Sequence, residues 1–148
     1  MTWTGRTVRF VTPLIALIAH DAKKSEMLEL VQEHLALLSG ADLVATETTG
    51  RMLREQLGLD IRCVLSGPFG GDLQIGALVA SERIGMVIFL RDPLSAHAHD
   101  PDINALMKVC DVHRVPLATN VGSARLCLRS YRPRVAALAA WRDHEEDD

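Results

Sequence analysis

Five short apolar runs, separated by segments with helical spacing, constrain the fold of this 148-residue chain more than any other feature. The first run, Pro13 to Ala19, is apolar throughout, which is typical of a strand buried on both faces of a sheet. The later runs are 43–45, 61–65, 86–90 and 115–118. Strands and helices that alternate in this way predict an α/β fold. We expect a three-layer, doubly wound, mainly parallel five-stranded sheet with helices on both faces.

The segments between the strands carry helix start and stop signals. Gly40 is suited to cap the first helix, and Gly58 stops the second. Asp100 as N-cap, followed by Pro101 at the first helical position, marks a later helix start. We therefore expect helices at about 22–38, from residue 50 to 57, at 73–81, from 101, from about 123, and at 134–141.

Length and charge narrow the possible classes of protein. The chain suits a single domain over residues 1–148, and we expect the acidic stretch 143–148 to fray. The net charge of −3 provides no basic field for nucleic acid or a membrane surface, and no apolar run reaches the roughly 18 residues that span a bilayer. Residues 1–10 do not lead into a signal-peptide pattern. The three scattered cysteines predict reduced thiols in a cytoplasmic protein.

Polar clusters follow the end of each predicted strand. These clusters are His20-Asp21, 46–49, 66–72, 92–102 and Thr119-Asn120. In an open parallel sheet, the edge formed by the carboxyl ends of the strands is where ligands bind. We therefore expect one binding site assembled from segments that lie far apart in the sequence.

The glycine-rich stretch from Ser66 to Asp72 lies between a predicted strand and a predicted helix. Its backbone can approach a ligand closely, and unpaired N–H groups at such a turn bind anions. Asp72 closes the stretch, where it either caps the helix or does chemistry. A carboxylate that faces a bound phosphate is well placed to act as a general base. Ser66 and Gly67 either add donors to the phosphate or form a tight turn alone.

Three threonines, Thr46, Thr48 and Thr49, lie at the start of the second predicted helix. One threonine is enough for an N-cap, so the cluster favours a phosphate cradle. Lys24 could reach the same phosphate, although a solvated helix lysine is the commoner role. Asp21 is as well explained by helix capping as by catalysis.

His97 and His99, with Asp100 and Asp102, have a composition that also suits metal binding. A facial metal site needs two histidines and a carboxylate with fixed partners, and the sequence shows no distant third ligand. We therefore predict no metal site. A histidine that polarises a carbonyl group is the alternative, and Asp102 in the first helical turn could simply complement the helix dipole.

Six segments taken together resemble the methylglyoxal synthase family. They are AHD-x-x-K (19–24), T-x-TTG (46–50), LSGPFGGDLQIGA (65–77), FLRDPL (89–94), HDPD (99–102) and VPLATN (115–120). The resemblance runs from about residue 8 to 130 and keeps the order of the family's motifs. The same fold occurs in domains of carbamoyl-phosphate synthetase and of a purine-synthesis cyclohydrolase. Those domains are not expected to carry the combination of GPxGGD and HDPD.

The resemblance implies conversion of dihydroxyacetone phosphate to methylglyoxal and inorganic phosphate, with no cofactor or metal. It implies Asp72 as the general base, His99 as the carbonyl donor, Asp102 as a group that tunes the site, and Asp21 as a further active-site aspartate. It places the substrate at His20, Lys24, Thr46, Glu47, Thr48, Thr49, Ser66, Gly67 and His99. It also implies a homohexamer that phosphate inhibits allosterically.

Glu47 is a departure from the family pattern, which has glycine at this position. A backbone with φ > 0 would be strained here, and a carboxylate that pointed inward would repel phosphate. We predict weaker substrate binding than in a Glu47→Gly variant.

Two other functions stay open from the residues alone. The first is a non-catalytic small-anion-binding regulatory domain of the same fold, which predicts binding without turnover. The second is a metal hydrolase that uses His97 and His99.

Overall fold

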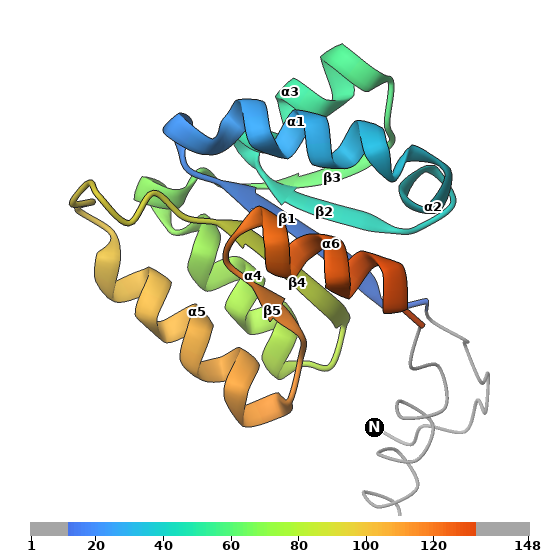
Figure 1. Cartoon of the computed structure of the whole chain (residues 1–148). Helices are drawn as coiled ribbons and strands as arrows, with labels where there is room; N and C mark the ends of the chain where they lie inside the picture. Colours follow the sequence, from blue (N-terminus) through green and yellow to red (C-terminus); the bar gives the residue numbers. More distant parts are fainter. Residues whose placement is uncertain (1–11, 133–148) are drawn as a thin grey trace, which may run out of the picture.

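The computed structural model describes residues 12–132. Along the chain, the elements are β1 (Leu14–Ala19), a 3₁₀ helix η1 (Asp21–Lys23), α1 (Lys24–Glu33), α2 (Leu35–Ser39), β2 (Leu43–Thr46), α3 (Glu47–Leu57), β3 (Ile61–Val64), η2 (Gly67–Phe69), α4 (Gly71–Ala80), β4 (Ile84–Leu90), α5 (Asp100–His113), β5 (Leu117–Ala118) and α6 (Val121–Ser130). The alternation of strands and helices is confirmed (Figure 1). The helix expected at 134–141 and the acidic stretch 143–148 lie outside the described residues.

The five strands form one parallel sheet in the order β3-β2-β1-β4-β5. The central strand β1 pairs with β2 on one side and with β4 on the other. All six residues of β1 are buried, because its side chains alternate between the two faces and both faces are covered. This explains the uninterrupted apolar run in the sequence.

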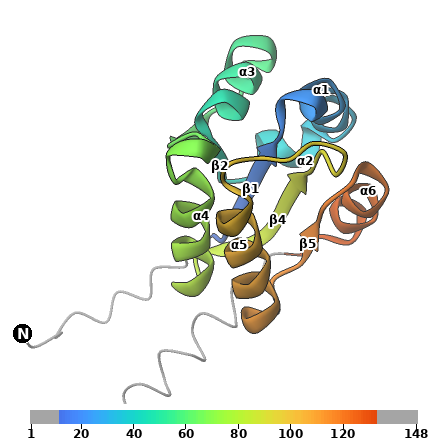
Figure 2. The same ribbon diagram turned by 90° about the vertical axis from the view of Figure 1, so that its left-hand side faces the viewer.

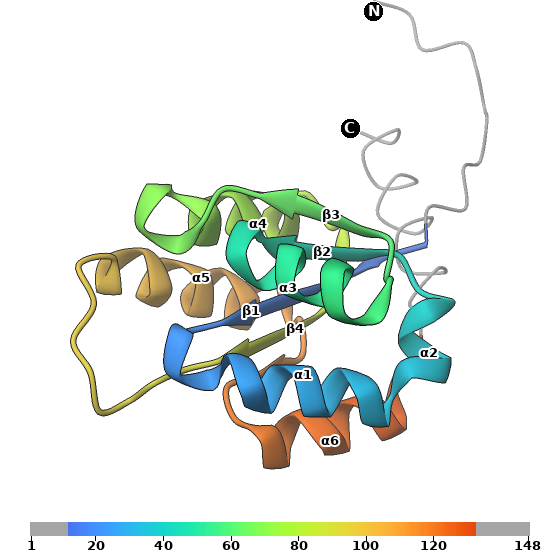
Figure 3. The same cartoon turned by 90° about the horizontal axis from the view of Figure 1, so that it is seen from above.

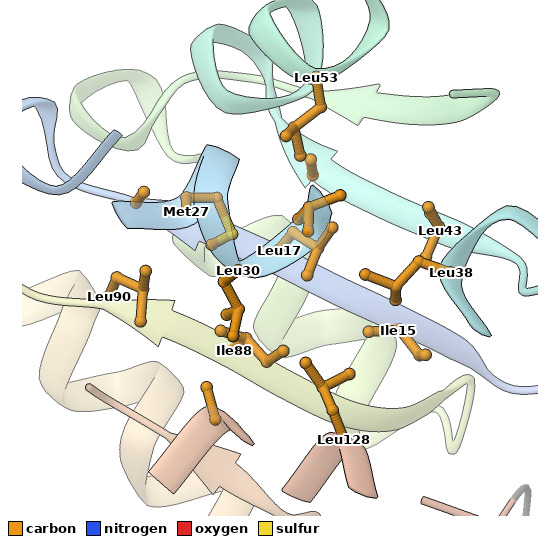
Figure 4. Close-up of a cluster of buried hydrophobic side chains, with 14 of the residues drawn as sticks. Ile15, Leu17, Met27, Leu30, Leu38, Leu43, Leu53, Ile88, Leu90 and Leu128 are labelled. Carbon is orange, nitrogen blue, oxygen red and sulfur yellow. The ribbon is translucent and has the colours of Figure 1, made fainter. Parts of the chain in front are cut away.

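Two hydrophobic cores lie on opposite faces of the sheet. Helices α1, α2, α3 and α6 cover one face, where Leu17, Leu30 and Leu128 belong to a single cluster (Figure 4). Helices α4 and α5 cover the other face and bury Ile75 and Leu106 (Figure 2). The structure therefore has the predicted three layers.

The first predicted helix is divided in two, which corrects the expected single helix at 22–38. The interruption is at His34, whose φ of −118° and ψ of 26° are not helical. The His34 backbone N–H donates to Val31 O instead of Leu30 O, and the His34 side chain bonds to the Leu30 carbonyl at 2.9 Å. When a side chain bonds to the carbonyl oxygen that its own backbone N–H would use in a helix, the regular series of helical hydrogen bonds ends. Gly40 caps the second piece, as predicted.

Other helix starts also differ from the predicted ones. Helix α5 begins at Asp100, with His99 at the N-cap position, because the Asp100 side chain turns back to accept from the His97 N–H at 3.3 Å. Helix α4 begins at Gly71, immediately after the left-handed Gly70 (φ +97°). Asp72 therefore lies within the first turn of α4 and does not cap it.

The sheet changes direction at β1, because β2 and β3 extend to one side while β4 and β5 lie on the other. The connections that leave β1 and β4 diverge at this point, which is where ligands bind in doubly wound sheets. Figure 3 shows the loop before α5, the end of β1 and the turn before α4 at the same end of the molecule. Among residues 12–132, no helix has the length and apolar character needed to cross a bilayer.

Candidate active site

The glycine-rich turn after β3 packs against the histidine that precedes α5. A Cβ atom on Gly67 would lie 2.8 Å from His99 Nε2, so only glycine leaves room for this imidazole. A Cβ on Gly71 would collide with the Leu65 carbonyl oxygen, which explains a second glycine in the same turn. The turn therefore places the start of α4 directly beside His99.

Asp72 is fully buried at this position, and its Oδ2 lies 3.8 Å from His99 Nε2. Neither carboxylate oxygen has a hydrogen-bond partner among the described residues. Burial raises the pKa of Asp72, His99 opposes that shift, and Asp102 adds to it. A carboxyl group in this state is a stronger base than a solvated one when it is ionised.

His20, which follows β1, is held from two sides. Its Nδ1 accepts a hydrogen bond from the Asp92 backbone N–H at 2.9 Å, and its ring stacks on His97 with centroids 3.9 Å apart. Burial, followed by electrostatic interactions with His97, His99 and Arg91, lowers the pKa of His20 to about 4. His20 is therefore a neutral imidazole at pH 7, and its Nε2 carries the proton because Nδ1 is the acceptor.

A second group of polar atoms gathers at the carbonyl oxygen of Ala19, the residue before His20. Lys24 Nζ donates to Ala19 O at 2.6 Å and to Thr49 Oγ1 at 3.2 Å, while Thr46 Oγ1 lies 3.5 Å from Thr49 Oγ1. Thr46 and Thr49 are buried. Burial lowers the pKa of Lys24, and Asp21 offsets part of that effect. This group joins one cation to two hydroxyl groups at the start of α3, an arrangement suited to an anion.

The sequence-predicted residues therefore fall into two groups, which His20 connects. Asp72, His99 and Gly67 form one group, and Lys24, Thr46 and Thr49 form the other. Asp102 lies close enough to Asp72 to influence its pKa. Ser66, the residue before η2, and Thr48, in the first turn of α3, are partly buried.

Two predicted residues point toward solvent. The Asp21 side chain is 99% exposed and pairs with Lys24 at 3.6 Å, so it reaches the site only through that lysine. Glu47 is exposed in the first turn of α3, and its φ is not positive. The backbone strain considered for Glu47 is therefore absent, and its carboxylate favourably complements the dipole of α3.

A neighbouring cavity of about 320 Å³ opens beside the ends of β4 and β5. Arg91, Lys23, Thr119 and Asn120 are among the residues that line it. Asp72, His99 and Gly67 do not line this cavity, so the structure does not bring Thr119 and Asn120 into the Asp72 group. Asn120 also caps α6 through a hydrogen bond from the Ser123 N–H at 2.9 Å, which gives it a structural role.

Sequence reasoning missed the convergence of three histidines. One ring nitrogen from each of His20, His97 and His99 lies within 4.8 Å of the others, so a distant third histidine does accompany the pair in the loop. The sequence does not show that these residues are close in space. His20 and His97 have 76 residues between them, and only the pairing of β1 with β4 brings them together. The stacking of His97 on His20 left no sequence signal.

Known proteins resemble this chain in sequence and in fold. The family model described as the MGS-like domain matches residues 26–119. Methylglyoxal synthases of Burkholderia mallei and Burkholderia pseudomallei are each 55% identical to it over 128 residues, which is 86% of this chain and 98% of the relative. The crystal structure of a methylglyoxal synthase from Elizabethkingia anophelis matches with a TM-score of 0.75 and 41% identity, over 80% of this chain and 78% of that chain.

Proposed function

Because the chain belongs to the methylglyoxal synthase family, we propose that it is a carbon–oxygen lyase that converts dihydroxyacetone phosphate to methylglyoxal and inorganic phosphate. The observation that carries this proposal is the buried Asp72 carboxyl group, which lies beside His99 and has no hydrogen-bond partner in the part of the chain that the structure describes. A regulatory anion-binding domain has no use for such a base, which makes the non-catalytic alternative less favoured.

The first step is removal of a proton from the hydroxymethyl carbon of the substrate. Asp72 takes this proton, and the electron pair moves toward the carbonyl oxygen to give an enediolate. His99 donates a hydrogen bond to that oxygen and stabilises the developing charge. Asp102 raises the pKa of Asp72 and so increases its basicity.

Phosphate departure completes the reaction. The carbon–carbon double bond of the enediolate shifts toward the phosphate-bearing carbon as the carbon–oxygen bond to phosphate breaks, while the hydroxyl group on the first carbon becomes the aldehyde and its proton leaves with the phosphate. Protonation of the resulting enolate at its terminal carbon gives methylglyoxal, and release of the proton held by Asp72 regenerates the base. The breaking bond must lie out of the enediolate plane to overlap the π system. Firm binding of the phosphate would fix that torsion.

The second polar group supplies the phosphate contacts in this proposal. Lys24, Thr46 and Thr49 are joined by hydrogen bonds, and the start of α3 adds N–H groups with the positive end of its dipole. Thr48, Ser66, Gly67 and His20 complete the binding positions. Asp21 acts indirectly, by pairing with Lys24.

The experiment mixes purified protein with dihydroxyacetone phosphate and traps methylglyoxal as it forms. We expect methylglyoxal and inorganic phosphate in equal amounts, with activity that survives exhaustive chelation. Substrate binding without methylglyoxal would support the regulatory domain instead. Release of phosphate without methylglyoxal, which chelation abolishes and zinc restores, would support the metal hydrolase.

We also propose that the enzyme is a cytoplasmic homohexamer. The three cysteines are free thiols, and large apolar side chains such as Phe69 and Leu94 are exposed on the single chain. Light scattering on the protein as it elutes from a size-exclusion column tests the hexamer.

Inorganic phosphate is in this proposal both the product and an allosteric inhibitor. A sigmoidal dependence of the rate on substrate concentration in the presence of phosphate tests this regulation.

A further inference from the structure

We infer that His97 is a positioning residue for this reaction: its imidazole stacks on His20 and, together with the Asp92 backbone amide, holds His20 in the orientation that presents its Nε2–H to the substrate. This role rests on the proposed function.

The stacking geometry is the first observation. The rings of His97 and His20 are 3.9 Å apart at an interplanar angle of 25°. The His20 ring also forms a T-shaped pair with the Phe89 ring, with centroids 5.2 Å apart and an interplanar angle of 90°. Two aromatic neighbours therefore fix the plane of the His20 ring, and the Asp92 N–H fixes its rotation within that plane.

The backbone of His97 is itself anchored. Its N–H donates to Asp100 Oδ2 at 3.3 Å, and its carbonyl oxygen accepts from the Asp100 N–H at 3.1 Å. These reciprocal bonds tie residue 97 to the first turn of α5, which is also where His99 enters the site. The ring of His97 is therefore held by the same turn that positions the proposed carbonyl donor.

The hydrogen bonding of His20 decides what kind of ligand the three histidines favour. Nδ1 accepts from Asp92, so the proton of the neutral ring is on Nε2, which is buried and has no partner in the described part of the chain. A metal ion would need that nitrogen without its proton. The convergent nitrogens of His20, His97 and His99 are therefore better suited to an anionic oxygen of the substrate than to a cation.

The test compares two substitutions of the same residue. His97→Ala removes the stacked ring, and we expect kcat/KM to fall about 10- to 100-fold because a misdirected His20 misplaces the substrate. His97→Phe keeps a flat ring, and we expect it to restore most of the lost kcat/KM. His113→Ala, at the opposite end of α5, is the control and should match the wild type.

An NMR titration of the histidine rings provides a readout that does not depend on turnover. The groups that affect His20 are its own burial, His97, His99, Arg91 and Asp92. We expect the pKa of His20 to rise from about 4 toward its ordinary 6.5 in His97→Ala, where the ring becomes solvated, and to stay low in His97→Phe.

Three results would overturn this role. One is a His97→Ala protein with wild-type kcat/KM and an unchanged His20 titration. Another is an equal loss of kcat/KM in both variants, which would show that the His97 nitrogens act and not the stacked ring. The third is tight binding of Zn²⁺ that requires His97. An inactive wild type with the expected titrations would instead contradict the proposed function and leave the stacking confirmed.

Discussion

Asp72 is a fully buried carboxyl group without a hydrogen-bond partner among residues 12–132, and such a group destabilises a fold when it is ionised. Its pKa in the folded chain is raised above the ordinary 3.8, mainly by burial. The folded state therefore holds the proton to higher pH than the unfolded state does. The stabilising contribution of the protonated form is complete below pH 3.8 and is lost as the pH rises through the folded pKa.

Replacing Asp72 with asparagine should therefore increase stability near neutral pH while it abolishes the base. We expect Asp72→Asn to unfold at higher denaturant concentration than the wild type at about pH 7, with the difference shrinking toward about pH 4. Chemical denaturation at both pH values measures this. An Asp72→Asn protein that is less stable than the wild type at neutral pH would show that the carboxylate is well solvated or well paired.

Glu47 is exposed at the start of the helix proposed to bind phosphate, so its charge acts on the substrate without direct contact. We expect Glu47→Gly to lower KM by a few-fold, because the nearby negative charge is removed. Glu47→Gln removes the charge alone and should reproduce most of the change. Equal KM values in all three proteins would mean that solvent screens the Glu47 charge completely.

Single residues were predictable where their motif carries chemistry. Asp72, His99 and Gly67 were identified from the sequence, and the structure brings them together. Asp21 was also expected in the site, but its carboxylate faces solvent. His97 was considered only as a metal ligand, because stacking between side chains distant in sequence has no local pattern.

At the scale of elements, the turn before α4 is the most constrained segment. Gly67→Ala would place a Cβ 2.8 Å from His99 Nε2, so the imidazole must move. We expect kcat to fall on the order of 100-fold with little change in stability. Gly76→Ala on α4 is the matched control, because its Cβ would meet Val109 Cγ1 at an ordinary 3.7 Å. Gly67→Ala with wild-type kcat would show that His99 can shift without consequence.

Each strand and each longer helix was predictable, while the two 3₁₀ helices, the division of the first helix into α1 and α2, and several boundaries were not. Apolar runs and capping residues identify a strand or helix, but its first residue depends on individual hydrogen bonds. His34 ends α1 early by taking the Leu30 carbonyl, and Asp100 shifts the start of α5 by bonding back to His97. Hydrogen bonds from single side chains to the backbone set these boundaries, and hydrophobic periodicity does not predict such bonds.

At the scale of the whole molecule, the core under α1 holds the sheet and its ligand-binding edge in place. Leu30 is completely buried in that cluster, whereas Leu126 on α6 is 64% exposed. We expect Leu30→Ala to lose about 2–5 kcal/mol of unfolding free energy and Leu126→Ala to lose almost none. Urea denaturation measures both. Similar losses in the two variants would contradict this placement of the core.

The order of the strands could not be predicted from the sequence, although the parallel sheet could. Alternating elements require crossover connections, but they do not specify that β4 returns to the far side of β1. That return creates the divergence of loops at which His20 meets His97 and His99. The sequence therefore named part of the candidate site, with His97 missed as a partner of His20 and Asp21 facing solvent, and it did not predict the arrangement.

The most direct measurement compares the kcat of Asp72→Asn with that of the wild type, using dihydroxyacetone phosphate and trapped methylglyoxal. Removal of the base should lower kcat by several orders of magnitude, about 10²- to 10⁴-fold, while the variant remains folded and still binds the substrate. A folded Asp72→Asn protein that forms methylglyoxal at nearly the wild-type rate would contradict the assignment of Asp72 as the group that takes the carbon-bound proton.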